Sequence, residues 1–226
     1  GAATSTGDRE GEIIETQPVP PLDPAQIALV LAGFVGESLQ TPPMYSAIKQ
    51  DGQPLYRLAR AGKTVERQPR PIRIECLELL GQSEPHTLDC RVTCGKGTYV
   101  RVLAEDIAHK LGTVGHVSLL RRERVAPFES AQMVDLATVE QCARQGVPLT
   151  LVGLSEAVAH LPLVRLDEAG ARRISQGQEV VVPGLAPPMD QVLRLEDASA
   201  RFLGLGRVAG VGRIAAKRLV RQGSHE

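Results

Sequence analysis

Two residues that could do chemistry, Tyr99 and Arg101, stand two positions apart in the stretch CGKGTYVR at residues 94–101. A phenol ring can stack on a planar base or offer a hydroxyl, and a guanidinium orients a carboxylate or a phosphate through paired hydrogen bonds. The same spacing also fits two surface residues in the first turn of a helix. The pair therefore marks a candidate site, but it does not identify a reaction.

Asp23 is a carboxylate that could either react or begin a helix, and it lies in PPLDPAQIALVL at residues 20–31. The residues after it repeat at the spacing of one apolar helical face, namely Ile27, Val30, Leu31 and Phe34. Pro24 suits the first helical position, and Gln26 stands where a capping box is closed. We therefore predict that Asp23 is a helix N-cap, whose carboxylate accepts backbone hydrogen bonds.

Several catalytic and cofactor patterns are absent from the sequence. The four cysteines show no CxxC spacing, which argues against a zinc site or a disulfide framework. GKGT at 95–98 lacks the spacing of a phosphate loop, and GLGRVA (204–209) and GVGRIA (210–215) fit only a loose dinucleotide pattern. We predict that the last two are hairpin turns and that the protein has no metal site. His116, a lone histidine, is expected to be structural or to face RNA.

The formal net charge of zero hides an uneven distribution. Residues 1–40 hold 1 basic and 6 acidic residues, residues 41–126 hold 14 and 9, and residues 127–226 hold 11 and 11. Two stretches are strongly basic, residues 49–73 and residues 201–221. Two basic surfaces favour a polyanionic partner, although solvated charged faces are an equally simple interpretation.

The spacing of apolar residues and the positions of proline and glycine predict the elements that must position Tyr99 and Arg101. Residues 41–73 are basic and interrupted by prolines, which predicts a projecting arm with a short helix that ends at Gly62. Residues 71–80 and 86–94 are predicted strands. After the glycine turn, Thr98 is predicted to cap a helix that ends at Gly112.

The rest of the chain is predicted to contain a further strand at residues 116–128 and a helix at residues 133–145. The texture changes near Ala159, where we place a domain boundary. Residues 160–226 are predicted to form short strands joined by glycine turns, a small β-rich domain. No membrane-spanning run or signal peptide is visible, so a cytoplasmic location is expected.

Three stretches together are similar to the bacterial TruB family of tRNA pseudouridine synthases. They are TPPMYSAIKQDGQPLYRLARAGKTVERQPRPI (41–72), CGKGTYVRVLAEDIAHKLG (94–112) and HVSLLRRERVAPF (116–128). The opening ATSTGDREGE (3–12) resembles the family's LGxxTxTGDxxGE segment, and the C-terminal part is similar to the PUA domain of bacterial members. The resemblance implies an α+β fold with the mixed or antiparallel sheet of pseudouridine synthases in residues 1–159, followed by an RNA-binding PUA domain in residues 160–226.

The family resemblance also implies a function: isomerisation of uridine 55 in the T-arm loop of tRNA, by base flipping and an aspartate nucleophile and without a cofactor. Tyr99 would line the uridine pocket, Arg101 would pair with the nucleophilic carboxylate, and Leu120 would form an apolar wall against the base. Residues 41–73 would be the thumb that closes on the T-loop. The residues expected to contact RNA are Tyr45, Lys49, Arg57, Arg60, Lys63, Arg67, Lys96, His116, Arg121 and Arg122.

One feature departs from the family pattern. The family's nucleophile lies in a GxLDPxAxG motif before the TGD segment, and the chain begins after that point. Asp23 stands in LDPA but lacks the flanking glycines and follows the TGD segment. We therefore expect the nucleophile to lie upstream of this chain and the fold to be incomplete at its N-terminus, with exposed apolar surface. The chain alone should then be inactive and should need its missing N-terminal segment to fold stably.

Two alternatives remain open from the sequence. A non-catalytic RNA-binding or tRNA-folding module would use the arm and the basic stretch at 201–221 without performing chemistry. A nucleotide-binding enzyme is disfavoured by the motif failures described above. The predicted partner is the T-arm stem-loop of tRNA, no membrane is expected to be involved, and the protein is expected to be a monomer.

Overall fold

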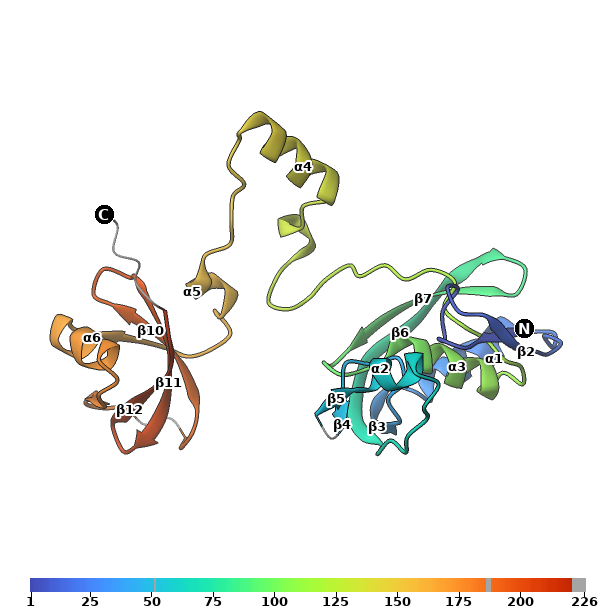
Figure 1. Ribbon diagram of the computed structural model, residues 1–226, viewed down its shortest axis with the longest axis horizontal. Coiled ribbons are helices and arrows are strands. Elements are labelled where there is room, and N and C mark those ends of the chain that lie inside the picture. Colours follow the sequence, from blue (N-terminus) through green and yellow to red (C-terminus); the bar gives the residue numbers. More distant parts are fainter. Residues whose placement is uncertain (51, 186–187, 221–226) are drawn as a thin grey trace. The chain divides into compact units, whose positions relative to one another are not determined.

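The computed structural model describes residues 1–50, 52–185 and 188–220 (Figure 1). Asp51 in the predicted arm and Arg221 in the C-terminal basic stretch lie outside the described residues. The chain divides into two compact units, one of residues 1–121 and one that begins at Arg122. Among the described residues, no helix has the length and apolar character needed to cross a membrane.

The first unit is built on an antiparallel sheet in the order β3 (Gly36–Gln40), β6 (Arg70–Glu84) and β7 (Thr87–Cys94). The two strands predicted at 71–80 and 86–94 are therefore confirmed. Helices α1 (Pro24–Ala32) and α3 (Val100–Lys110) pack with this sheet in one apolar core. Its buried side chains are Ile27, Leu31, Ile72, Ile74, Leu77, Leu103 and Leu111.

The two helices begin where local chemistry allows, but only one cap was predicted correctly. The Asp23 carboxylate accepts a hydrogen bond from the Ala25 backbone N–H at 3.4 Å, which confirms Asp23 as the N-cap of α1. The prediction that Thr98 caps α3 was wrong. Tyr99 is the N-cap, and its side chain makes no capping hydrogen bond. The Thr98 hydroxyl is buried and has no hydrogen-bond partner among the described residues.

Two short strands at the start of the chain, β1 (Ala2–Thr4) and β2 (Ile13–Thr16), form an antiparallel pair. The loop between them pairs with a distant segment through one parallel bridge, Asp8 to Val117. The strand predicted at 116–128 was wrong. Within it, described pairing is limited to this bridge and to one between Val125 and Phe128, and the charged residues between them are exposed to solvent.

The predicted arm contains β4 (Lys49–Gln50), β5 (Gln53–Pro54) and helix α2 (Leu55–Arg60). Leu55 is buried, and the chain leaves the helix through Gly62, which has a φ of +70°. The short helix predicted from the leucine spacing is thus confirmed. Most of the basic side chains of the arm remain exposed to solvent.

Residues between the two sheets form η1 (Ser130–Gln132), α4 (Leu136–Gln145) and α5 (Leu154–Ala157). Asp135 caps α4 by accepting a hydrogen bond from the Thr138 N–H at 2.7 Å, and the helix is left without a buried side chain. The predicted domain boundary near Ala159 differs from the observed division after Arg121. The change in residue pattern near Ala159 comes just before the second sheet, whose first strand, β8, begins at Leu163.

The second unit contains a five-stranded mixed sheet in the order β8-β10-β11-β12-β9. Its elements are β8 (Leu163–Leu166), α6 (Glu168–Ser175), β9 (Val180–Val181), β10 (Val192–Asp197), β11 (Phe202–Gly210) and β12 (Arg213–Leu219). Strands β8 and β10 pair in parallel, and the other described pairings of this sheet are antiparallel. GVGRIA spans the β11–β12 turn as predicted, but GLGRVA lies inside β11. Together, the two units confirm the α+β fold class.

Candidate functional site

The side chain of Arg101 connects three separate parts of the first unit. One terminal nitrogen donates to the Thr6 backbone carbonyl at 2.9 Å and to the Asp8 carboxylate at 3.0 Å. The other terminal nitrogen donates to the Tyr45 carbonyl at 2.9 Å. Arg101 lies in the first turn of α3, Asp8 in the β1–β2 loop and Tyr45 at the base of the arm. A single guanidinium therefore holds the helix, the loop and the arm together.

The Asp8 carboxylate is held on more than one side. The Thr6 hydroxyl donates to it at 2.7 Å and the Glu10 backbone N–H at 3.2 Å, in addition to Arg101. These donors lower the pKa of Asp8 below its ordinary value, with the Thr6 hydrogen bond as the largest cause. Asp8 is thus a charged acceptor whose position is fixed before any ligand arrives.

The loop that carries Asp8 depends on Gly7. Its φ is +74°, in the left-handed region that favours glycine. A Cβ at this position would lie 2.5 Å from a Glu105 carboxylate oxygen and 3.3 Å from the Arg101 Cβ. Burial raises the pKa of Glu105, and the neighbouring charge of Asp106 adds to this effect. The loop, α3 and a second carboxylate therefore pack closely beside Arg101.

Tyr99, another of the predicted catalytic residues, is held through its backbone. Its N–H donates to the side-chain oxygen of Gln40 at 2.8 Å, and its carbonyl accepts from the side-chain nitrogen of Gln40 at 3.1 Å. The ring is half-buried. Tyr99 and Arg101 therefore share one helical turn whose starting point is fixed from β3.

The base of the arm is also fixed to its own far end. The half-buried Arg67 donates to the Pro42 carbonyl at 3.0 Å, so the predicted RNA contact at Arg67 has a structural partner. The Arg60 guanidinium lies 5.6 Å from the centre of the Tyr56 ring, a cation–π distance. The remaining predicted basic contacts of the arm and the glycine turn are exposed, namely Lys49, Arg57, Lys63 and Lys96.

Four further predicted residues lie outside this cluster of contacts. His116 contacts the Ala2 carbonyl through its ring Nδ1 at 2.6 Å, which supports a structural role in fixing β1. Leu120, the predicted apolar wall, is 58% exposed. Arg121 is exposed at the end of the first unit and Arg122 is exposed at the start of the second.

Sequence reasoning missed three residues of the site: Thr6, Asp8 and Gln40. The first two lie in the segment ATSTGDREGE, which carried part of the family resemblance but was given no role. The Asp8 carboxylate could have been paired with Arg101 only by knowing that Val117 brings the loop toward α3. Gln40 carries no sequence signal, because an amide at the end of a strand has no characteristic motif.

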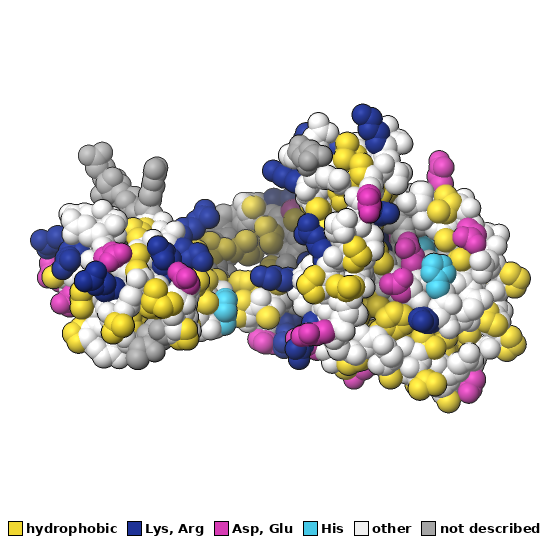
Figure 2. All heavy atoms as spheres, turned by 90° about the horizontal axis from the view of Figure 1, so that it is seen from below, with side chains coloured by type: hydrophobic (Ala, Val, Ile, Leu, Met, Phe, Trp, Pro, Cys, Tyr) yellow, Lys and Arg dark blue, Asp and Glu magenta, His cyan; other side chains and the backbone are white. Residues whose placement is uncertain are grey.

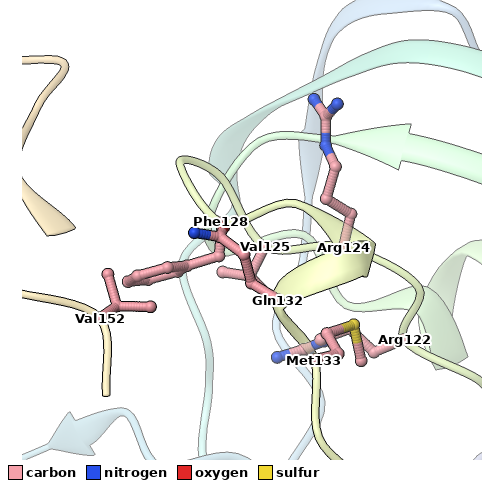
Figure 3. Close-up of a pocket in the computed structure, with 7 residues that line it drawn as sticks. All are labelled: Arg122, Arg124, Val125, Phe128, Gln132, Met133 and Val152. Carbon is pink, nitrogen blue, oxygen red and sulfur yellow. The ribbon is translucent and has the colours of Figure 1, made fainter. Parts of the chain in front are cut away.

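Two cavities are lined by described residues of the second unit. One has a volume of about 320 Å³ and is lined by residues between Arg122 and Val152 (Figure 3). The ring of Phe128 faces Val152 across it, and the Arg124 guanidinium points away from it. The lining is mostly apolar, and it includes none of the residues around Arg101.

The second cavity has a volume of about 540 Å³ and lies between α6 and the turn from β10 to β11. Asp197, one of its lining residues, accepts hydrogen bonds from the Ser199 hydroxyl at 2.6 Å and from the Arg201 side chain at 2.8 Å. These donors lower the pKa of Asp197 to about 2, and the Ser199 hydrogen bond is the largest cause. Figure 2 shows several lysine and arginine side chains on one face of this unit, interspersed with acidic ones.

Comparison with known proteins identifies family models along most of the chain. Residues 1–100 match the model for the TruB family pseudouridylate synthase N-terminal domain. Residues 101–150 match a tRNA pseudouridylate synthase B C-terminal domain, and residues 162–220 match a model described as pseudouridine synthase II TruB, C-terminal.

Among curated relatives, the tRNA pseudouridine synthase B of Stutzerimonas stutzeri (strain A1501) is 44% identical over 225 residues, which is 98% of this chain and 72% of the relative. The protein of the same name from Pseudomonas aeruginosa (strain UCBPP-PA14) is 42% identical over 98% of this chain and 73% of its own length.

Solved structures share the fold at lower sequence identity. A chain from a Cbf5-Nop10-Gar1 complex matches with a TM-score of 0.65 at 22% identity, over 87% of this chain and 59% of its own length. A chain from an H/ACA RNP bound to a substrate RNA containing 2'-deoxyuridine matches with a TM-score of 0.66 at 18% identity, over 90% and 63%. The protein therefore spans about three fifths of these solved chains.

Proposed function

We propose, from the premise that the chain belongs to the TruB family of pseudouridine synthases, that it serves the isomerisation of uridine 55 in the T-arm loop of tRNA to pseudouridine. The observation that carries the proposal is the position of Arg101. Arg101 stands two positions after Tyr99. Its guanidinium donates hydrogen bonds to the Tyr45 carbonyl at the base of the arm and to the Asp8 carboxylate. This arrangement places a charged, orienting group where a projecting basic arm meets the sheet.

The reaction requires the target base to leave the loop, because its glycosidic bond is otherwise inaccessible. A carboxylate then bonds to the nucleotide as the bond from the ribose to the base nitrogen breaks. The uracil turns and a ring carbon bonds to the ribose as the carboxylate leaves; that carbon loses its proton and the freed nitrogen gains one, so that the product is an isomer of the substrate. Among the described residues, three of the five N–H groups of Arg101 have acceptors. The remaining two are available to orient the attacking carboxylate. Tyr99 is proposed to line the base pocket and Leu120 to contact the base.

The arm is proposed to hold the RNA backbone. Lys49, Arg57 and Lys63 are exposed, and the base of the arm is fixed by hydrogen bonds from Arg67 and Arg101. Exposed cations on a fixed support suit phosphate contacts, which position an RNA without reading its sequence. This binding should weaken as salt increases.

The attacking carboxylate is proposed to come from a segment outside this chain. Asp23 is engaged as the cap of α1, and Asp8 already accepts hydrogen bonds from Thr6, Glu10 and Arg101. A nucleophile needs a lone pair directed at the substrate, whereas Asp8 is arranged to hold Arg101.

A pseudouridine assay on a T-arm stem-loop RNA tests this proposal. The chain is measured alone and together with a polypeptide that carries the GxLDPxAxG motif of a relative, and an RNA with cytidine at the target position is the matched control. Turnover only in the mixture is the expected result. Turnover by the chain alone would refute the external nucleophile, and binding without turnover in either sample would favour the non-catalytic RNA-binding module.

A further inference from the structure

The side chain of Gln40 makes a two-point contact with the backbone of one residue 59 positions later. Its oxygen accepts from the Tyr99 N–H at 2.8 Å and its nitrogen donates to the Tyr99 carbonyl at 3.1 Å. Gln40 is only 5% exposed. The two backbone groups also fix which end of the amide is which, because an N–H can only donate and a carbonyl can only accept.

This contact supplies the start of α3 with partners that the helix itself lacks. Tyr99 is the N-cap, and neither its own side chain nor the Thr98 hydroxyl makes a capping hydrogen bond. The Tyr99 carbonyl accepts the first intrahelical bond from Leu103 at 3.0 Å as well as the bond from Gln40. Gln40 therefore fixes where the first turn begins, and Arg101 lies in that turn.

The same residue stands at the root of the arm. Gln40 is the last residue of β3, where it pairs with Arg70 of β6. The arm begins at the next residue, and five residues after Gln40 the Tyr45 carbonyl accepts a hydrogen bond from Arg101. These contacts form a closed ring. Hydrogen bonds join Gln40 to Tyr99 and Arg101 to Tyr45, and the backbone joins Tyr99 to Arg101 and Tyr45 to Gln40.

We propose that Gln40 is a positioning residue that fixes the first turn of α3 to the root of the arm, so that Arg101 reaches the Asp8 carboxylate and the Tyr45 carbonyl at the same time. An amide is the side chain this role requires, since it offers one donor and one acceptor to a paired N–H and C=O. A longer or apolar side chain would leave both groups of Tyr99 without these partners. The role rests on the proposed function, because it concerns the same site.

Gln40→Met tests the proposal, since it keeps the length of the side chain and removes both hydrogen bonds. Gln141→Met, at an exposed position of α4, is the matched control. In the mixture of chain and motif-bearing polypeptide, Gln40→Met should lower the single-turnover rate about 10- to 100-fold. The dissociation constant for the stem-loop RNA should change by less than about threefold, because the exposed cations of the arm remain. Equal losses of rate and affinity, or an unchanged rate, would overturn the proposal.

Two measurements on the whole chain decide the role of Gln40 even if no turnover is found, in which case the proposed function fails by itself. Amide hydrogen exchange at Tyr99 should become at least about tenfold faster in Gln40→Met, without a change in the second half of α3. The pKa of Asp8, followed by NMR, should rise part of the way toward its ordinary value as Arg101 loosens, because the Thr6 hydrogen bond, the largest cause of the lowered pKa, remains. Uniformly faster exchange across the first unit, or an unchanged pKa of Asp8, would show that Gln40 only supports folding.

Discussion

The Arg101 guanidinium lies 3.0 Å from the carboxylate of Asp8, 93 residues earlier in the chain. Both side chains are about one quarter exposed, so solvent still screens the pair. The value of the pair is geometric, because the same guanidinium also holds the Tyr45 carbonyl. The position of Arg101 is thus set from two sides.

Replacing Asp8 with asparagine removes its charge and keeps its shape. Arg101 then loses its ionic partner, so we expect the single-turnover rate of the mixture to fall by about tenfold or more. The free energy of unfolding should fall by no more than about 1 kcal/mol, as for other partly exposed ion pairs. Glu37→Gln, which breaks the exposed pair of Glu37 with Arg73, is the control and should leave the rate unchanged. A free energy of unfolding lowered by clearly more than about 1 kcal/mol, with an unchanged single-turnover rate, would contradict this role of Asp8.

Gly7→Ala should disturb the loop that carries Asp8. The φ of +74° alone costs a residue with a Cβ about 1 kcal/mol, and the new Cβ would press on Glu105 and on the Arg101 Cβ. Gly62→Ala is the matched control, because its φ is +70° and the space around it is open. Urea unfolding should show a larger loss of stability for Gly7→Ala. The Glu105→Ala change should recover part of the difference, and no recovery would exclude Glu105 as the cause.

The lowered pKa of Asp197 predicts that the second unit loses stability in acid. Its pKa is about 2 in the folded protein and about 3.9 in an unfolded chain. The lowered pKa means that the ionised form stabilises the fold fully above pH 4, and that this contribution is lost as the pH falls from about 4 to 2. Thermal unfolding followed by a probe in this unit should show that loss. In Asp197→Asn the pH dependence between 4 and 2 should be weaker, and an unchanged profile would assign the transition to other carboxylates.

Local patterns predicted the elements better than they predicted the contacts of the site. Asp23 and the spacing of Ile27 and Leu31 specify the start and the buried face of α1 through interactions within a few residues. The Arg101–Asp8 and Gln40–Tyr99 contacts join residues far apart in the sequence, so no local pattern could show them. The strand predicted at 116–128 failed for a related reason. A segment with strand-forming residues becomes a strand only where a neighbouring strand pairs with it. Among the described residues, only isolated bridges form at 116–128.

The exposed cations of the arm should control affinity for RNA more than the rate of reaction. We expect Lys63→Ala and Arg57→Ala each to weaken binding of a T-arm stem-loop, since each removes one potential partner of a phosphate. The slope of log affinity against log salt should become shallower by about 0.7 to 0.9 for each phosphate that is no longer neutralised. Fluorescence anisotropy at several salt concentrations measures both quantities, and Lys110→Ala, an exposed cation at the end of α3, is the control. An unchanged slope with reduced affinity would show that the arm residues act on folding instead, because the number of ions released changes only when fewer phosphates are neutralised.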